Sequence, residues 1–264
     1  MLIILLFGFL FLYGPIISLI VYSFNESRLV TVWAGFSTQW YSALIHNQPL
    51  LNAAWLSVKI AFINAWIAIV LGTLAAIALV RFPKSAGNKS LEVMTTAPLV
   101  MPDIIIGLSL LLLFVAMENL FGWPANRGEL TIILAHSTFS MAYVTVVVRS
   151  RLAHMDRSLE EAALDLGAQP IKVFFTVTLP LIAPALAAGW LLAFTLSMDD
   201  VVVANFVSGP GATTLPMMVY SSIRLGVSPQ INALATIIIA IVAFSVLLSG
   251  FIMYKKERRQ AKLL

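Results

Sequence analysis

The stretch "SLEEAALDLGAQPIKVFFTVTLP", residues 158–180, interrupts a chain that otherwise consists of long apolar runs. Its Ser158, followed three residues later by Glu161, predicts a capping box at the start of a helix. Gly167 suits the left-handed residue that ends a helix, and Pro170 suits the first position of the next one. We therefore predict two short helices, joined by a glycine turn, between two apolar segments.

Both short helices are predicted to be amphipathic, because their apolar residues recur at helical spacing. The first stripe consists of Leu159, Ala162, Ala163 and Leu166. The second stripe consists of Ile171, Phe174, Phe175 and Thr178. Pro180 and Pro184 are expected to end or kink the second helix. We expect one stripe to pack on the rest of the chain and the other on a partner protein. The same periodicity fits a helical loop that packs only against its own bundle.

The composition of the whole chain predicts an all-α, polytopic membrane protein. Of its 264 residues, 60% are hydrophobic and 11% are charged, and the mean hydropathy is +0.96. Soluble domains are about 45–50% apolar and about 25% charged. A membrane-spanning helix needs about 20 mostly apolar residues, and six runs meet this length: residues 2–24, 56–80, 93–117, 130–148, 184–206 and 232–254. The first run lacks the basic start and small-residue cleavage site of a signal peptide, so we expect it to be retained.

The distribution of Lys and Arg predicts the orientation of these spans. If both termini are cytoplasmic, 12 of the 16 basic residues fall on the cytoplasmic side. Such a bias is the usual signal of orientation in membrane proteins, and it also accounts for the net charge of +4 without nucleic acid. Residues 150–183 are then expected to face the cytoplasm between the fourth and fifth spans.

Three segments of residues 158–180 resemble the EAA loop of ABC-importer permeases. They are Glu161-Ala162-Ala163, then Gly167, then Val177-x-Leu179-Pro180, and Val177 in place of Ile is the only departure. The resemblance implies a type I ABC-importer permease (MetI-like) fold, with residues 1–264 as one transmembrane permease domain and 150–183 as its coupling loop. It also implies that the loop sits in a cleft of a cytoplasmic ATP-hydrolysing subunit, with these coupling residues: Glu161, Ala162, Ala163, Gly167, Leu179 and Pro180.

Other stretches resemble the polyamine branch of this family. They are "VYSFNESRLVTVWAGFSTQWY", "TAPLVMPDIIIGLSLLLLFVA", "GWPANRGELTIILAH" and "SMDDVVVANFVSGPGATTLPM". The resemblance implies transport of putrescine, spermidine or both across a bacterial inner membrane. The implied partners are a second homologous permease, two copies of an ATP-binding subunit and a periplasmic polyamine-binding protein. ATP and Mg are implied to bind the partner ATPase, so this chain is expected to hold no cofactor and no metal.

Acidic residues inside the predicted spans are the candidates for contact with such a substrate. Asp103 follows Pro98 and Pro102, which are expected to break the third span, and Asp199 and Asp200 lie near the outer end of the fifth. Charges within spans are costly and by default indicate function, and a chain of protonated amines would find its partners in carboxylates and aromatic faces.

Each acid also has a structural alternative. Asp103 could cap the helix after Pro102, and Asp199 and Asp200 could bond the backbone or Arg224. We expect His136 to make an interhelical hydrogen bond rather than relay protons. The tryptophans at 33, 40 and 123 are expected to anchor the protein at the membrane interface, the first two within a short interfacial helix.

An enzyme and an ion-coupled secondary transporter are the other two classes of function to consider for this sequence. An enzyme is disfavoured because the sequence contains no G-x4-G-K-[ST], H-E-x-x-H or G-x-S-x-G motif. An ion-coupled secondary transporter of a small cationic solute is the alternative to the permease. It would favour internal repeats with broken helices in both halves, whereas this chain has one predicted broken helix and no visible repeat.

Overall fold

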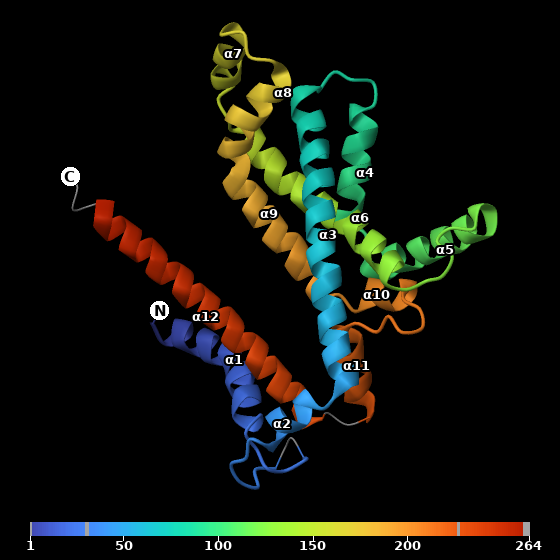
Figure 1. Cartoon of the computed structure of the whole chain (residues 1–264), viewed down its shortest axis with the longest axis vertical. Helices are drawn as coiled ribbons and strands as arrows, with labels where there is room; N and C mark the ends of the chain where they lie inside the picture. Colours follow the sequence, from blue (N-terminus) through green and yellow to red (C-terminus); the bar gives the residue numbers. More distant parts are fainter. Residues whose placement is uncertain (1, 30–31, 226–227, 261–264) are drawn as a thin grey trace. The chain divides into compact units, whose positions relative to one another are not determined.

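The computed structural model describes residues 2–29, 32–225 and 228–260. In these residues the regular structure is helical, apart from one isolated β-bridge between Asn25 and Phe36 (Figure 1). The helices are α1 (Leu2–Tyr22), α2 (Gln39–Ile45), α3 (Gln48–Arg81), α4 (Asn88–Val100), α5 (Asp103–Phe121), α6 (Glu129–Ala153), α7 (Ser158–Asp165), α8 (Pro170–Val173), α9 (Leu179–Asp199), α10 (Val202–Val207), α11 (Leu215–Leu225) and α12 (Pro229–Gln260).

The predicted membrane spans all fall on helices. Within the described ranges, five helical segments are long and apolar enough to cross a bilayer: Ile4–Tyr22, Gln48–Arg81, Asp103–Phe121, Glu129–Ala153 and Pro170–Asp199. The sixth predicted run falls on α12, whose described apolar part, Pro229–Phe244, is shorter. The basic residues 255–262, which contribute to the predicted orientation, have side chains outside the described part of the chain.

The third predicted run is broken at one of its two prolines. Pro98 lies inside α4, which continues to Val100, so the prediction that it breaks the helix was wrong. The break comes at Met101 and Pro102, both of which have extended ψ angles, 136° and 139°. A residue before proline is pushed out of the helical region by the ring, and α5 then starts at Asp103.

The fifth predicted run differs from the structure at both ends. Helix is continuous from Pro170 to Asp199 through a π-turn at Phe174–Thr178, so Pro180 and Pro184 do not end it. The wider turn, in which the Leu179 N–H bonds the Phe174 carbonyl, relieves the clash that a proline ring makes with the carbonyl four residues earlier. At the other end, Asp200 and Val201 separate α9 from the short α10.

The chain packs as two compact units, residues 52–218 and residues 1–51 with 219–264. In the larger unit α6 is central and packs on α9 and α4. Small residues bring α3 and α6 close together. A Cβ at Gly72 would lie 2.7 Å from Cγ1 of Val144, and Ala65, Ala68 and Val144 are fully buried. This core holds the two ends of the larger unit in fixed positions.

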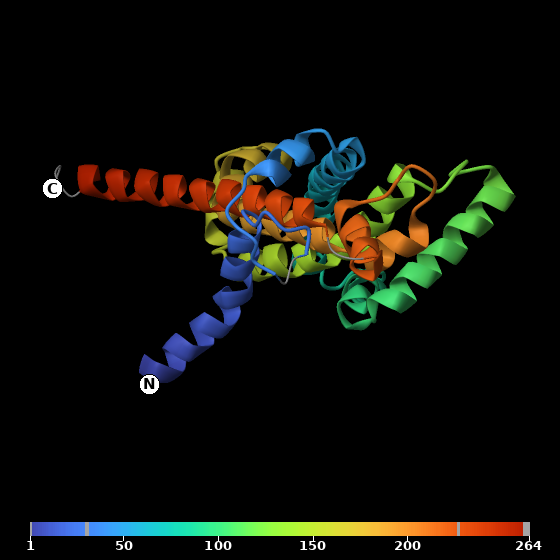
Figure 2. The ribbon, with the colours of Figure 1, turned by 90° about the horizontal axis from the view of Figure 1, so that it is seen from below.

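In the smaller unit α12 packs against α1 and α2, as the second view also shows (Figure 2). The prediction that Trp40 anchors the protein at the membrane interface was wrong, because Trp40 is 8% exposed. Its Nε1–H donates to the Asn25 carbonyl at 2.6 Å. The predicted interfacial helix corresponds only to α2, and Trp33 lies before it and is 48% exposed.

Candidate functional site

The glycine turn after α7 has the predicted geometry. Gly167 has a φ of +84°, and its N–H donates to the Leu164 carbonyl at 2.8 Å. The N–H of Ala168 donates to the Ala163 carbonyl at 3.1 Å. These two bonds form a Schellman motif, which ends a helix by satisfying its last carbonyls. Pro170 then opens α8, as predicted.

The start of α7 differs from the predicted capping box. The N-cap is Arg157, and no side chain caps it. Instead, Oδ1 of Asp156 accepts a hydrogen bond from the Ser158 N–H at 2.9 Å. This bond to the backbone of Ser158 holds the pKa of the Asp156 carboxyl below its ordinary value. Ser158 is already the first helical residue, so its hydroxyl lies past the capping position, and an aspartate two residues earlier takes over as in an Asx turn.

The predicted stripe of α7 is open rather than packed. Leu166 is 90% exposed and Leu159 is 48% exposed, and Glu161 and Ala162 are exposed as well. The helical segment that follows has one buried and one exposed face. Val173 and Thr178 are buried, whereas Ile171 and Phe175 are exposed. Leu179 and Pro180 form the first turn of α9, and Pro180 is exposed.

Polar contacts attach α7 to the rest of the larger unit. Oε2 of Glu160 lies 2.6 Å from Nη2 of Arg81 at the end of α3. Oε1 of Glu160 accepts a hydrogen bond of 2.6 Å from the hydroxyl of Thr178. Arg157 donates to the carbonyl of Val80 at 3.0 Å. The sequence analysis did not identify Glu160, because no local pattern indicates that it contacts Arg81 and Thr178. A cavity of about 250 Å³ lies beside this ion pair and is also lined by Leu164.

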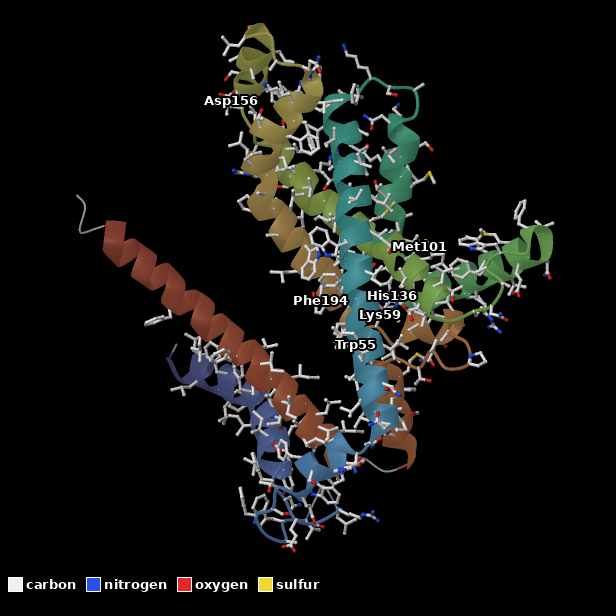
Figure 3. All side chains as sticks on the ribbon, in the orientation of Figure 1. Trp55, Lys59, Met101, His136, Asp156 and Phe194 are labelled. Carbon is white, nitrogen blue, oxygen red and sulfur yellow. The ribbon has the colours of Figure 1, made fainter. Side chains whose placement is uncertain are left out.

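The three predicted acids line one pocket at the other end of α9. The pocket has a volume of about 410 Å³, and its lining includes Asp103, Asp199 and Asp200. Phe139 and Tyr143 of α6 add two aromatic rings to the same wall, and sequence reasoning missed both. The labelled side chains His136 and Asp156 mark the two regions, the pocket end and the α7 end of the same unit (Figure 3).

The carboxylate of Asp200 is bonded within the protein. It accepts hydrogen bonds from the backbone N–H groups of Val203 at 3.2 Å and Ala204 at 2.7 Å. Its Oδ2 also lies 3.2 Å from Nε2 of His136, whose Nδ1 lies 2.6 Å from the hydroxyl of Ser197. His136 therefore links α6 to the end of α9, which confirms the predicted interhelical bond. Asp200 caps α10, as the structural alternative supposed, while the side chain of Arg224 lies outside the described residues.

Asp103 and Asp199 differ from Asp200. Both are exposed, and neither side chain forms an ion pair with a cation among the described residues. Asp103 is the first residue of α5, where a negative charge is favoured by the helix dipole, and the predicted capping bond is not formed. The pocket therefore offers two carboxylates that a bound cation could use and a third that holds the backbone.

Comparisons with known proteins identify the family of the chain. Residues 68–262 match the family described as "Binding-protein-dependent transport system inner membrane component". The putrescine transport system permease protein PotI of Escherichia coli (strain K12) is 58% identical over 260 residues, which cover 98% of this chain and 92% of that protein. The spermidine/putrescine transport system permease protein PotC of the same strain is 43% identical over 248 residues, which cover 94% of this chain and 91% of that protein.

Solved structures show the same fold. A chain of a bacterial ABC transporter involved in the import of the acidic polysaccharide alginate has a TM-score of 0.72 at 17% identity, with 94% of each chain covered. A chain of the MetNI methionine ABC transporter has a TM-score of 0.62 at 15% identity, covering 77% of this chain and 94% of that one. With the family match over most of its length and relatives of high identity, this chain belongs to the family of binding-protein-dependent transport system inner membrane components.

Proposed function

We propose that this permease subunit carries a linear polyamine, putrescine or spermidine, along a path that includes the acidic pocket. The observation that carries the proposal is the meeting of Asp103 and Asp199, both exposed, with Phe139 and Tyr143 in one pocket. The relatives named as putrescine and spermidine/putrescine permeases support it. Membership of this family sets aside the ion-coupled secondary transporter.

The chemistry of the pocket suits a chain of protonated amines. A carboxylate accepts a charge-assisted hydrogen bond from an ammonium group, worth about 1.5–3 kcal/mol. An aromatic face attracts a cation that passes over it. Two carboxylates on different helices favour a solute whose positive charges lie on separate atoms. A few such contacts give weak binding, which a translocation path needs if the solute is to leave.

The three acids have different roles in the pocket because their surroundings differ. Asp103 and Asp199 face the solute, because both line the pocket, both are exposed and neither pairs with a cation among the described residues. Asp200 is a positioning residue, because its oxygens accept from the backbone of α10 and approach His136. His136 is 0% exposed and so holds Asp200 from behind rather than touching the solute.

The partners and orientation follow from α7 and from the basic residues. The exposed stripe of α7 meets a cytoplasmic ATP-hydrolysing subunit, which binds the ATP and Mg while this chain binds no cofactor. A second homologous permease completes the path, two copies of the ATPase drive the pair, and a periplasmic binding protein delivers the polyamine. Both termini lie in the cytoplasm and the chain resides in a bacterial inner membrane, as the bias of Lys and Arg indicates.

The test is transport by the whole complex with the two solute-facing charges removed. In proteoliposomes that contain the complex, Asp103→Asn with Asp199→Asn is expected to lower putrescine uptake at least tenfold, because two charge-assisted contacts are lost and tenfold corresponds to only about 1.4 kcal/mol. The amide keeps the size of the side chain, so assembly and ATP binding should be unchanged. Initial rates of uptake of radiolabelled putrescine give the measurement.

Two further variants serve as controls. The first removes a carboxylate outside the pocket, and the second removes the structural carboxylate of Asp200. Glu129→Gln removes an acid of the same unit that pairs with Lys59 on the surface, at 2.7 Å, and should leave uptake near the parental rate. Asp200→Ala removes a helix cap and should lower the midpoint of thermal unfolding, at a cost of about 0.5–2 kcal/mol. Parental uptake by an assembled double variant would show that the path lies elsewhere.

A further inference from the structure

The helix α7 is attached to the rest of the larger unit although its residues are not buried. None of its eight residues, all of which the structure describes, is buried, so apolar packing does not hold it in place. Its stripe points away from the unit, with Leu166 90% exposed. If a partner displaces α7, the movement reaches other helices only through contacts that attach α7 to them. The contacts described for α7 are polar.

Glu160 supplies most of these contacts, and it reaches two different helices. One oxygen pairs with Arg81, the last residue of α3, at 2.6 Å. The other accepts from Thr178, the residue immediately before α9, at 2.6 Å. Both partners are shielded, since the side chains of Arg81 and Glu160 are each 17% exposed and Thr178 is buried. Burial strengthens such a contact, because water competes less for it.

The neighbours of Glu160 do not make equivalent contacts. Glu161, in the motif that identifies the loop, is exposed, and its side chain makes no ion pair or hydrogen bond among the described residues. Arg157 bonds only α3, through the Val80 carbonyl. Glu160 is thus the residue of α7 whose side chain contacts both α3 and the start of α9 in the described structure.

We propose that Glu160 is a positioning residue that fixes α7 to α3 and α9, so that a displacement of α7 moves both helices together. The inference rests on the proposed function in one respect, that α7 contacts the ATPase. A single helix connects this contact to the acidic pocket. Thr178 leads directly into α9, and α9 ends at Asp199, next to Asp200. Loosening Glu160 should therefore separate ATP hydrolysis from transport without removing the ATPase.

The test is the number of ATP molecules hydrolysed per putrescine transported, measured with the complete complex in proteoliposomes and its binding protein. Glu160→Gln keeps an acceptor for Thr178 and weakens the pair with Arg81. Thr178→Val keeps the pair and the shape but removes the hydroxyl. Glu160→Ala removes both contacts and is expected to raise the ratio about fivefold or more, the lower end of ordinary coupling between sites. The two milder variants should lie between Glu160→Ala and the parent.

Controls distinguish this role from a merely structural one. Glu92→Gln breaks another carboxylate–guanidinium pair of the same unit, with Arg149 at 2.8 Å, and should leave the ratio unchanged. Combining Arg81→Glu with Glu160→Arg restores the link to α3 but leaves no acceptor for the Thr178 hydroxyl, so the ratio should lie between those of Glu160→Ala and the parent. A parental ratio in Glu160→Ala, or no recovery in the reversed pair, would overturn the inference. Failure of the parental permease to retain the ATPase would instead overturn the proposed function.

Discussion

Gly167 is the residue that allows α7 to end and α8 to begin with only four residues between them. Its φ of +84° is in the left-handed region, and a Cβ placed on it would have no heavy atom within 4 Å. The position thus requires glycine for its backbone conformation and not for space. A Cβ would meet no neighbour there, so the cost of a substitution comes mainly from the backbone conformation.

Replacement of Gly167 should follow the conformational preference of the new residue. Gly167→Val is expected to cost about 1–2 kcal/mol, because a β-branched residue resists the left-handed region. Gly167→Asn should cost less, because asparagine adopts this conformation more readily. Retention of the ATPase by the purified permease should fall in the order glycine, asparagine, valine. Equal retention by all three would mean that the orientation of α7 does not depend on this turn.

At the scale of elements, some features could be read from the sequence and others could not. Apolar runs and the turn at Gly167 depend on neighbouring residues, and they were predicted well. The break of α4 and α5 at Pro102 was predicted for a local reason too. The π-turn before α9 and the separation of α10 were missed, because Pro180 marks a disturbance of the helix but not its form, and Asp200 was not assigned to the N–H groups that follow it. Glu160 was missed because its partner Arg81 belongs to a distant helix.

The approach of α3 to α6 gives a prediction about packing. A Cβ at Gly72 would lie 2.7 Å from Val144 Cγ1 and 2.9 Å from the Met141 carbonyl oxygen, and the carbonyl belongs to a helix that cannot easily shift. Gly72→Ala is therefore expected to destabilise the protein by about 1–3 kcal/mol through overpacking. The midpoint of thermal unfolding in detergent gives the measurement.

The matched control for this packing prediction is Gly8→Ala in α1, where nothing lies within 4 Å of the added methyl group. Alanine is the better helix former at an interior position, so this variant should unfold no earlier than the parent. A Gly72 variant as stable as the Gly8 variant would show that α3 and α6 can move apart without cost.

At the scale of the whole molecule, the ion pair between Arg81 and Glu160 brings two loops to the same side of the membrane. These are the loop after α3 and the loop that contains α7. The 25 residues of α6 span about 37 Å at 1.5 Å per residue, which exceeds the roughly 30 Å of a bilayer core. The loop between α5 and α6 should therefore lie on the opposite side. Three exposed positions, Ala86, Leu166 and Asn126, report on these loops.

Labelling of single cysteines tests this topology in a chain that has no native cysteine. In intact cells, a thiol reagent that cannot cross the inner membrane should modify Asn126→Cys and spare Ala86→Cys and Leu166→Cys. All three should react after the membrane is made permeable, which controls for accessibility. Modification of Ala86→Cys in intact cells would reverse the orientation, and different behaviour of Ala86→Cys and Leu166→Cys would contradict the pairing of the two loops.

The open stripe of α7 also bears on the fate of the protein before assembly. A permease synthesised in excess of its ATPase would leave Leu159 and Leu166 in contact with water, beside a connection held by a single glycine turn. Exposed apolar surface next to an irregular segment is what proteases and chaperones recognise in incomplete proteins. If α7 binds the ATPase as proposed, the same surface would mark unassembled copies for degradation, and the cellular amount of permease would follow the supply of its ATPase.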